Sequence, residues 1–97
     1  MDQDEALRQL REAKEKSKVK FLYATTTEAV SMRVWNGKKP IEKNVEIKVI
    51  PAGTRVLVNT ISKQGTVGIR DEDLSPPTVG YYARIVPDHL TDWSESV

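Results

Sequence analysis

Cysteine is absent from this chain, and histidine occurs only once, as His89. Without cysteine there is no disulfide framework, thiolate nucleophile or cysteine-ligated metal site, and one histidine would need other ligands to hold a metal. No apolar run approaches the roughly 18–20 residues of a membrane span, and the charged residues 1–16 do not resemble a signal peptide. We therefore expect a cytoplasmic protein without a membrane partner.

A strong excess of one charge is also lacking, since the formal net charge is only +1. The balance hides an asymmetry along the chain. Residues 28–55 contain six basic and three acidic side chains, whereas residues 61–97 contain three basic and six acidic ones. Such a layout can steer a charged partner, but it makes no strong case for nucleic acid.

The chain has 97 residues, which is the size of one domain with one modest core. Two leucines and two alanines recur at helical spacing between residues 6 and 13, with acids early and bases late, as the helix dipole favours. We expect residues 1–18 to form a helix or a flexible arm, residues 19–93 a small β-barrel domain, and residues 94–97 a disordered tail.

The clearest strand and turn signals lie in residues 51–70. Pro51 and Gly53 have turn chemistry, and the β-branched residues that follow favour a strand. Gly65 is expected at positive φ in the next tight connection, before a second strand begins. Within that second strand, Gly68 indicates a bulge, a barrel corner or a close approach of another backbone segment. The pattern predicts a β-hairpin.

The run AGTRVLV at residues 52–58, the run GTVGIR at residues 65–70 and the pair Asp73-Leu74 resemble the opening strands of Src-homology-3-like small barrels. The resemblance extends from Ala52 to about Leu90 and rests on glycine and valine spacing. That superfold includes nucleic-acid modules of the KOW type and many protein-binding modules. The resemblance therefore implies a fold, and assigns no site residue.

Alternation predicts four further strands, at residues 18–23, 29–35, 44–49 and 80–86. The side chains expected to face the core are Val19, Phe21 and Tyr23 in the first, Val30, Met32 and Val34 in the second, and Val45, Ile47 and Val49 in the third. Asn36-Gly37 is typical of a type I′ hairpin turn.

Pro87 suits the first position of a helix, and Leu90 and Trp93 stand three residues apart, so residues 87–93 are expected to form a helical turn. The expected fold class is mostly β. It is a small antiparallel barrel or strongly bent sheet of five to six strands, with a short N-terminal helix and a C-terminal helical turn.

No constellation of residues predicts catalysis, a metal or a cofactor. His89 follows Asp88, but two neighbours at a helix start do not make a catalytic dyad, and a surface or capping histidine is expected. The cluster from Asp71 to Asp73 lacks the spacing of a calcium loop and is interpreted as a turn and cap. We therefore expect a protein that is not an enzyme.

One surface pattern favours binding, at the predicted hairpin. It consists of Arg33, Trp35, Lys38 and Lys39, and Tyr82 and Arg84 would extend it if their strand is adjacent. An aromatic ring among cations on a strand face can stack a base while the charges follow phosphates. Alternatively, Trp35 covers the edge of the core and the lysines protect an edge strand from pairing.

Three functional hypotheses follow. The first is a non-enzymatic interaction module for a protein partner, anchored by the expected exposed aromatics Trp35, Tyr82 and Trp93. The second is a nucleic-acid-binding module that uses the basic-aromatic strand face, with affinity that falls steeply with salt. The third is a small hydrolase built from an aspartate, His89 and a threonine that the fold would have to bring together.

Overall fold

The structure of the chain, a computed structural model, describes residues 1–35, 47–71 and 80–96. These residues form one α-helix, seven β-strands and one 3-10 helix. The elements in chain order are α1 (Gln3–Glu15), β1 (Leu22–Thr26), β2 (Val30–Trp35), β3 (Ile47–Ile50), β4 (Arg55–Ile61), β5 (Val67–Asp71), β6 (Gly80–Ile85), η1 (Pro87–His89) and β7 (Leu90–Ser94).

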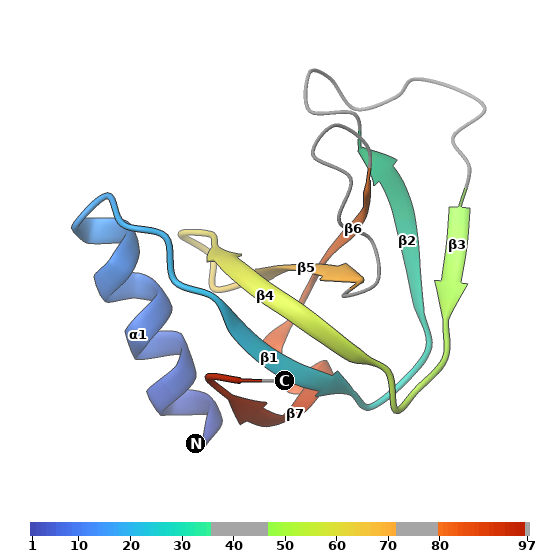
Figure 1. Cartoon of the computed structure of the whole chain (residues 1–97), viewed down its shortest axis with the longest axis horizontal. Helices are drawn as coiled ribbons and strands as arrows, with labels where there is room; N and C mark the ends of the chain where they lie inside the picture. The colour runs from blue at the N-terminus through green and yellow to red at the C-terminus, as the bar shows by residue number, and fades with distance from the viewer. Residues whose placement is uncertain (36–46, 72–79, 97) are drawn as a thin grey trace.

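All seven strands form one antiparallel sheet in the order β3-β2-β6-β5-β4-β1-β7. Figure 1 shows this sheet curling into an open half-barrel, with β3 and β7 at its two edges. The predicted mostly β class with an N-terminal helix is confirmed. The predicted count of five to six strands is wrong, because the described residues contain seven. The predicted Asn36-Gly37 turn lies outside the described residues.

The β4–β5 hairpin has the turns that the sequence predicts. Gly53 precedes β4 with a φ of +86°, and Gly65 precedes β5 with a φ of +90°. Buried Thr26 fixes the first of these turns, since its Oγ1 donates to the Pro51 carbonyl at 3.1 Å and accepts from the Thr54 N–H at 3.1 Å. These bonds satisfy the buried hydroxyl and attach the hairpin to β1.

Gly68 lies at an irregularity of this hairpin. The β4–β5 register shifts between Val58 and Thr60, so Thr60 lies opposite Gly68. A Cβ atom at position 68 would lie 2.2 Å from Thr60 Oγ1. The predicted irregularity therefore lies on the facing strand next to Gly68, and the close approach of the Thr60 side chain, rather than of another backbone segment, is the reason for a glycine there.

The predicted orientation of the first strand is wrong. β1 begins only at Leu22, which pairs with the buried Val58, and Ala24 pairs with the buried Val56. Cross-strand partners share a face, so the even-numbered residues of β1 enter the core. Phe21, which precedes the strand, is 50% exposed and Val19 is 71% exposed.

The predicted inward position of Val49 is also wrong, whereas two of the three predicted core residues of β2 are buried and the side chain of the third, Val34, lies outside the described residues. Val30 and Met32 of β2 are buried, as expected. In β3, Ile50 pairs with Val30 and is buried, while Val49 pairs with exposed Ser31 and is itself 62% exposed. The register against β2 thus places Val49 on the outer face and Ile50 in the core.

The predicted C-terminal helical turn is only partly present. η1 is one turn of 3-10 helix, but the chain continues from Leu90 as β7, paired with β1. Asp92 has a φ of +52°, and the β1–β7 register shifts in this region. This irregularity lets Leu90 and Trp93 face the same side, whereas residues three apart in a regular strand face opposite sides.

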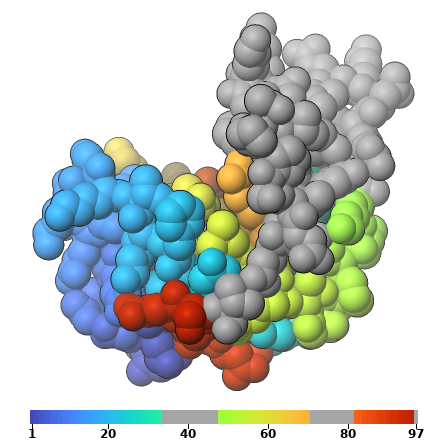
Figure 2. All heavy atoms as spheres, viewed as in Figure 1, coloured from blue at the N-terminus to red at the C-terminus, as the bar shows by residue number. Residues whose placement is uncertain are grey.

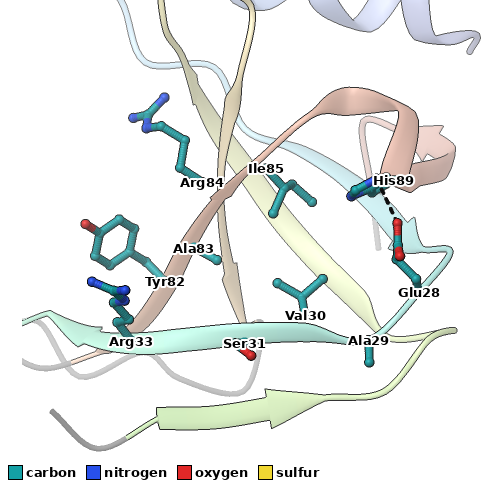
Figure 3. A pocket seen from close by; sticks show the side chains of 10 residues that line it. All are labelled: Glu28, Ala29, Val30, Ser31, Arg33, Tyr82, Ala83, Arg84, Ile85 and His89. Atoms are coloured by element: carbon teal, nitrogen blue, oxygen red, sulfur yellow. Dashed lines mark ion pairs between the residues drawn. The ribbon is translucent and has the colours of Figure 1, made fainter.

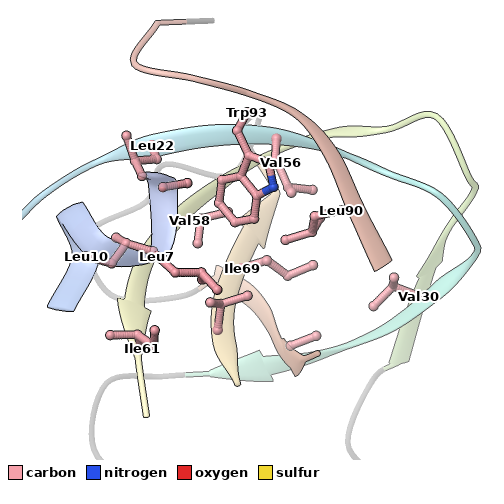
Figure 4. Packing of buried hydrophobic residues seen from close by; sticks show 14 of the residues in the cluster. Leu7, Leu10, Leu22, Val30, Val56, Val58, Ile61, Ile69, Leu90 and Trp93 are labelled. Carbon is pink, nitrogen blue, oxygen red and sulfur yellow. The ribbon is translucent and has the colours of Figure 1, made fainter. Parts of the chain in front are cut away.

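Trp93 is therefore not the exposed aromatic that the sequence predicts. It is 4% exposed and lies in the hydrophobic core. Figure 4 shows its indole among Leu22, Val58 and Leu90, inside the curl of the sheet. The buried Trp93 thus joins the last strand to β1 and β4.

Helix α1 packs against β4 and β7 through Ala6, Leu7 and Leu10, which are all buried. Asp2 caps the helix by accepting a hydrogen bond from the Glu5 N–H at 2.8 Å. In Figure 2 the helix in blue and the C-terminal strand in red lie next to each other, as the packing of α1 on β7 requires. No helix in the described ranges is both long and apolar enough to cross a membrane.

Candidate functional site

The sheet order brings together three of the residues in the predicted basic-aromatic surface. β2 lies next to β6, and Arg33 lies directly opposite Tyr82. Arg84 follows two residues along β6, on the same face as Tyr82. The Trp35 backbone pairs with Gly80 on the same ladder. Lys38 and Lys39 lie outside the described residues, so their part in the site stays a prediction.

Arg70 is a fourth member of this surface that sequence reasoning missed. It lies opposite Tyr82 on β5, so Arg33, Tyr82 and Arg70 form a row across three neighbouring strands. The row lies on the face away from the core, because Ile69 and Ala83, which flank these positions along their strands, are buried. Alternation around Ile69 could have placed Arg70 on an outer face, but not beside Tyr82.

A groove opens where β2 and β6 separate. Their ladder joins residues 33–35 of β2 to residues 80–82 of β6. Among the described residues, the neighbouring segments 30–32 and 83–85 pair with β3 and β5 on their outer sides, but not with each other. Figure 3 shows Val30, Ala83 and Ile85 between the two diverging ribbons.

The groove has a volume of about 520 Å³ and combines an apolar floor with polar ends. Val30 and Ala83 are buried in the floor, and Ile85 is packed partly against the core. The described residues that line the groove are Glu28, Ala29, Val30, Ser31, Arg33, Tyr82, Ala83, Arg84, Ile85 and His89. This size and lining are typical of sites that bind a short segment of chain or a small molecule.

One end of the groove is closed by contacts between the β1–β2 connection and η1. His89 Nε2 lies 2.7 Å from Glu28 Oε1, as the dashed line in Figure 3 marks. The Thr27 N–H donates to the His89 carbonyl at 2.9 Å. Asp88 makes a different contact, with α1, where its Oδ1 accepts a hydrogen bond from Gln3 Nε2 at 3.0 Å. The neighbouring Asp88 and His89 therefore serve separate contacts rather than one dyad.

A second hollow of about 480 Å³ lies on the other side of Tyr82 and Arg84, over Gly68. Its described lining residues are Asn59, Thr60, Gly68, Ile69, Arg70, Tyr82 and Arg84. The Arg84 side chain crosses toward β5, since its Nη1 lies 3.4 Å from the Thr66 carbonyl. Tyr82 and Arg84 thus form a ridge between the groove and the hollow over Gly68.

On the outer surface of α1, hydrogen bonds shift the pKa values of two side chains, those of Glu5 and Arg8. Hydrogen bonds from Arg8 and then Gln9 lower the pKa of Glu5, and those from Arg8 to Glu5 and Glu12 raise the pKa of Arg8. The described residues contain no cluster of three potential metal-ligating side chains. The groove and the hollow therefore offer a concave surface, backbone groups and arginine side chains.

Comparison with known proteins adds no relative. No protein-family model, no curated protein and no solved structure matches the chain.

Proposed function

We propose that this protein is a non-enzymatic interaction module that binds an extended segment of a protein partner in the groove between β2 and β6. The observation that carries the proposal is the separation of these two strands. Within the described part of the sheet, each strand has a segment that pairs on one side only, and both segments face the same groove. An extended chain inserted in the groove would pair with the inner backbone edges of these segments, in the way that exposed sheet edges bind extended peptides.

The lining of the groove favours a peptide over a polyanion. The apolar floor of Val30, Ala83 and Ile85 suits an apolar side chain of the partner. Glu28 and Arg33 stand toward opposite ends of the β2 side of the groove, so both signs of charge are present. The carboxylate would repel a continuous row of phosphates, whereas a peptide can carry a basic residue at one end and an acidic residue at the other.

We also propose that the protein is one of the Src-homology-3-like small barrels and that it is located in the cytoplasm. The open half-barrel and the hairpin of β4 and β5 are compatible with that assignment. The absence of cysteine from the sequence is compatible with a reducing compartment.

A display library of random peptides, selected against the intact protein, tests the groove. Selected peptides should bind the wild type, lose affinity for Ser31→Tyr, and keep it for Thr91→Tyr. Ser31 and Thr91 are both exposed strand residues, but only Ser31 lines the groove. Amide shifts on binding should map to residues 28–33 and 82–89. Binding that Ser31→Tyr leaves unchanged would rule out the groove as the binding site.

Nucleic-acid binding is the second candidate, and the row Arg33–Tyr82–Arg70 with nearby Arg84 favours it. An aromatic ring between guanidinium groups suits a stacked base flanked by phosphates. Titration with a short oligothymidylate at two salt concentrations separates the candidates. Shifts centred on these four residues that disappear at higher salt would support nucleic acid, because released counterions make such binding strongly salt-dependent. Wild-type shifts confined to the groove with selected peptides would favour the protein partner.

A further inference from the structure

We propose that the hollow over Gly68 binds a phosphoryl group carried by the protein partner, next to the peptide segment in the groove. This inference rests on the proposed function, since it assigns a modified residue to the partner that the groove would hold. The hollow and the groove share Tyr82 and Arg84 as lining residues. A side chain of a peptide in the groove therefore needs only to cross this ridge to enter the hollow.

Two arginines converge on the hollow from neighbouring strands. Gly68 pairs with Arg84 and Arg70 pairs with Tyr82, so Arg70 and Arg84 are diagonal neighbours on the outer face. Diagonal positions of an antiparallel pair are about 7–8 Å apart, and a guanidinium group on a long side chain can cover half that distance. Both cations can therefore reach one anion placed between them.

Gly68 lets two donor side chains approach the edge of the hollow. A Cβ atom there would lie 2.2 Å from Thr60 Oγ1 and 3.7 Å from Arg84 Nη2. The absence of a side chain thus lets a hydroxyl and a guanidinium approach the same point of the sheet. The contact of Arg84 Nη1 with the Thr66 carbonyl, at 3.4 Å, holds the guanidinium toward β5, over the hollow.

The donor set fits a phosphoryl group better than a carboxylate. Two guanidinium groups match its charge of nearly −2, and the Thr60 hydroxyl and the Asn59 amide add donors for its three oxygens. The described residues that line the hollow include no aspartate or glutamate.

Titration with inorganic phosphate, at constant ionic strength against chloride, tests the hollow without any peptide. The Gly68 amide and the Arg84 Nε–H should shift, and Arg70→Gln should weaken phosphate binding by about tenfold, as expected for a lost charged hydrogen bond. Lys63→Gln is the matched control, because Lys63 is an exposed cation outside the hollow. Equal phosphate affinity in Arg70→Gln and Lys63→Gln would overturn the proposal.

Thr60→Val keeps the proposal testable if Arg70→Gln does not fold, since Thr60 is exposed and loses only its hydroxyl. This variant should also weaken phosphate binding, and unchanged affinity would overturn the proposal. Peptides selected for the groove are then compared with and without phosphoserine, and with oligothymidylate. The phosphorylated form should bind more tightly to the wild type, and this gain should vanish in Arg70→Gln. If oligothymidylate bound more tightly than the unphosphorylated peptide while the phosphorylated peptide did not, a protein partner would be ruled out as the source of the phosphate.

The failures of the two proposals are distinguishable. Arg70 lines the hollow but not the groove, and Ser31 lines the groove but not the hollow. Unphosphorylated peptides that bind wild type and Arg70→Gln equally, and lose affinity for Ser31→Tyr, would support the groove whatever happens with phosphate.

Discussion

Thr60 and Gly68 face each other across the β4–β5 ladder so closely that position 68 has no room for a methyl group. The 2.2 Å between Thr60 Oγ1 and the position of a Cβ at 68 is far below any normal contact distance. The pair stands where the register of the two strands shifts. The identity of residue 68 is therefore tied to the side chain at position 60.

Gly68→Ala should destabilise the protein by about 1–3 kcal/mol, because the added methyl group meets Thr60 and overpacking of this kind costs that much. In the Thr60→Ala background the same substitution should cost much less. Chemical denaturation of the two single variants and the double variant gives the coupling. Additive effects of the two substitutions would show that the contact is not the cause.

Trp93→Ala should cost about 3–5 kcal/mol, since a large buried ring is removed from the core. Trp93→Phe should cost clearly less, because the buried indole Nε1 has no hydrogen-bond partner in the described part of the chain, so no bond is lost. Thermal unfolding followed by circular dichroism compares the two. A phenylalanine variant as unstable as the alanine variant would mean that the indole N–H has a partner.

Arg55 connects three strands at the β7 edge of the sheet. Its Nη1 donates to Thr25 Oγ1 at 3.0 Å on β1, and its Nη2 donates to Ser94 Oγ on β7. Arg55→Ala should therefore speed amide hydrogen exchange in β7 more than in β5. Arg84→Ala, on β6, serves as the control and should leave β7 exchange unchanged. Equal acceleration across the sheet would instead indicate a global loss of stability.

Leu10 tests how firmly α1 is docked. It is 3% exposed in the core, so Leu10→Ala should cost about 2–5 kcal/mol. Arg8→Ala removes only exposed ion pairs on the same helix, which water screens, so it should change the free energy of unfolding far less than Leu10→Ala. Chemical denaturation measures both. A Leu10→Ala cost as small as that of Arg8→Ala would mean that the helix contributes little to the fold.

Glu5 should give a small pH-dependent contribution to helix stability. Its folded pKa lies below the usual value of 4.5, chiefly because of the hydrogen bond from Arg8. The folded state therefore favours the carboxylate, and the contribution is present above pH 4.5 and is lost as the pH falls through the lowered pKa. The difference in melting temperature between wild type and Glu5→Gln should shrink on acidification. Glu15→Gln is the control, and a difference that acid leaves unchanged would contradict the assignment.

Features set by neighbouring residues were predictable from the sequence. Gly53 and Gly65 identified the two turns of the β4–β5 hairpin, because positive φ at a turn is a local demand. Val30 and Met32 identified the buried face of β2 by simple alternation. The same alternation placed Tyr82 and Arg84 on one face of the last predicted strand.

Features set by pairing between distant strands were not predictable. Phe21 and Val49 alternate with polar residues as core residues do, and only the registers of β1 against β4 and of β3 against β2 place them outside. Leu90 and Trp93 have helical spacing, which here results from an irregular strand. Arg70 joins the candidate surface only because β5 lies beside β6.

The sheet order also has a consequence for the folding pathway. β4 and β5 are neighbours in both sequence and space, so their hairpin can form early at a small loop-closure cost. By contrast, β7 pairs with β1 across most of the chain, and α1 packs on β7 as well as on β4. Such non-local pairing slows folding, so the complete docking surface of the first helix forms only when the last strand joins the sheet. The earliest segment of the chain is thus among the last to acquire its native packing.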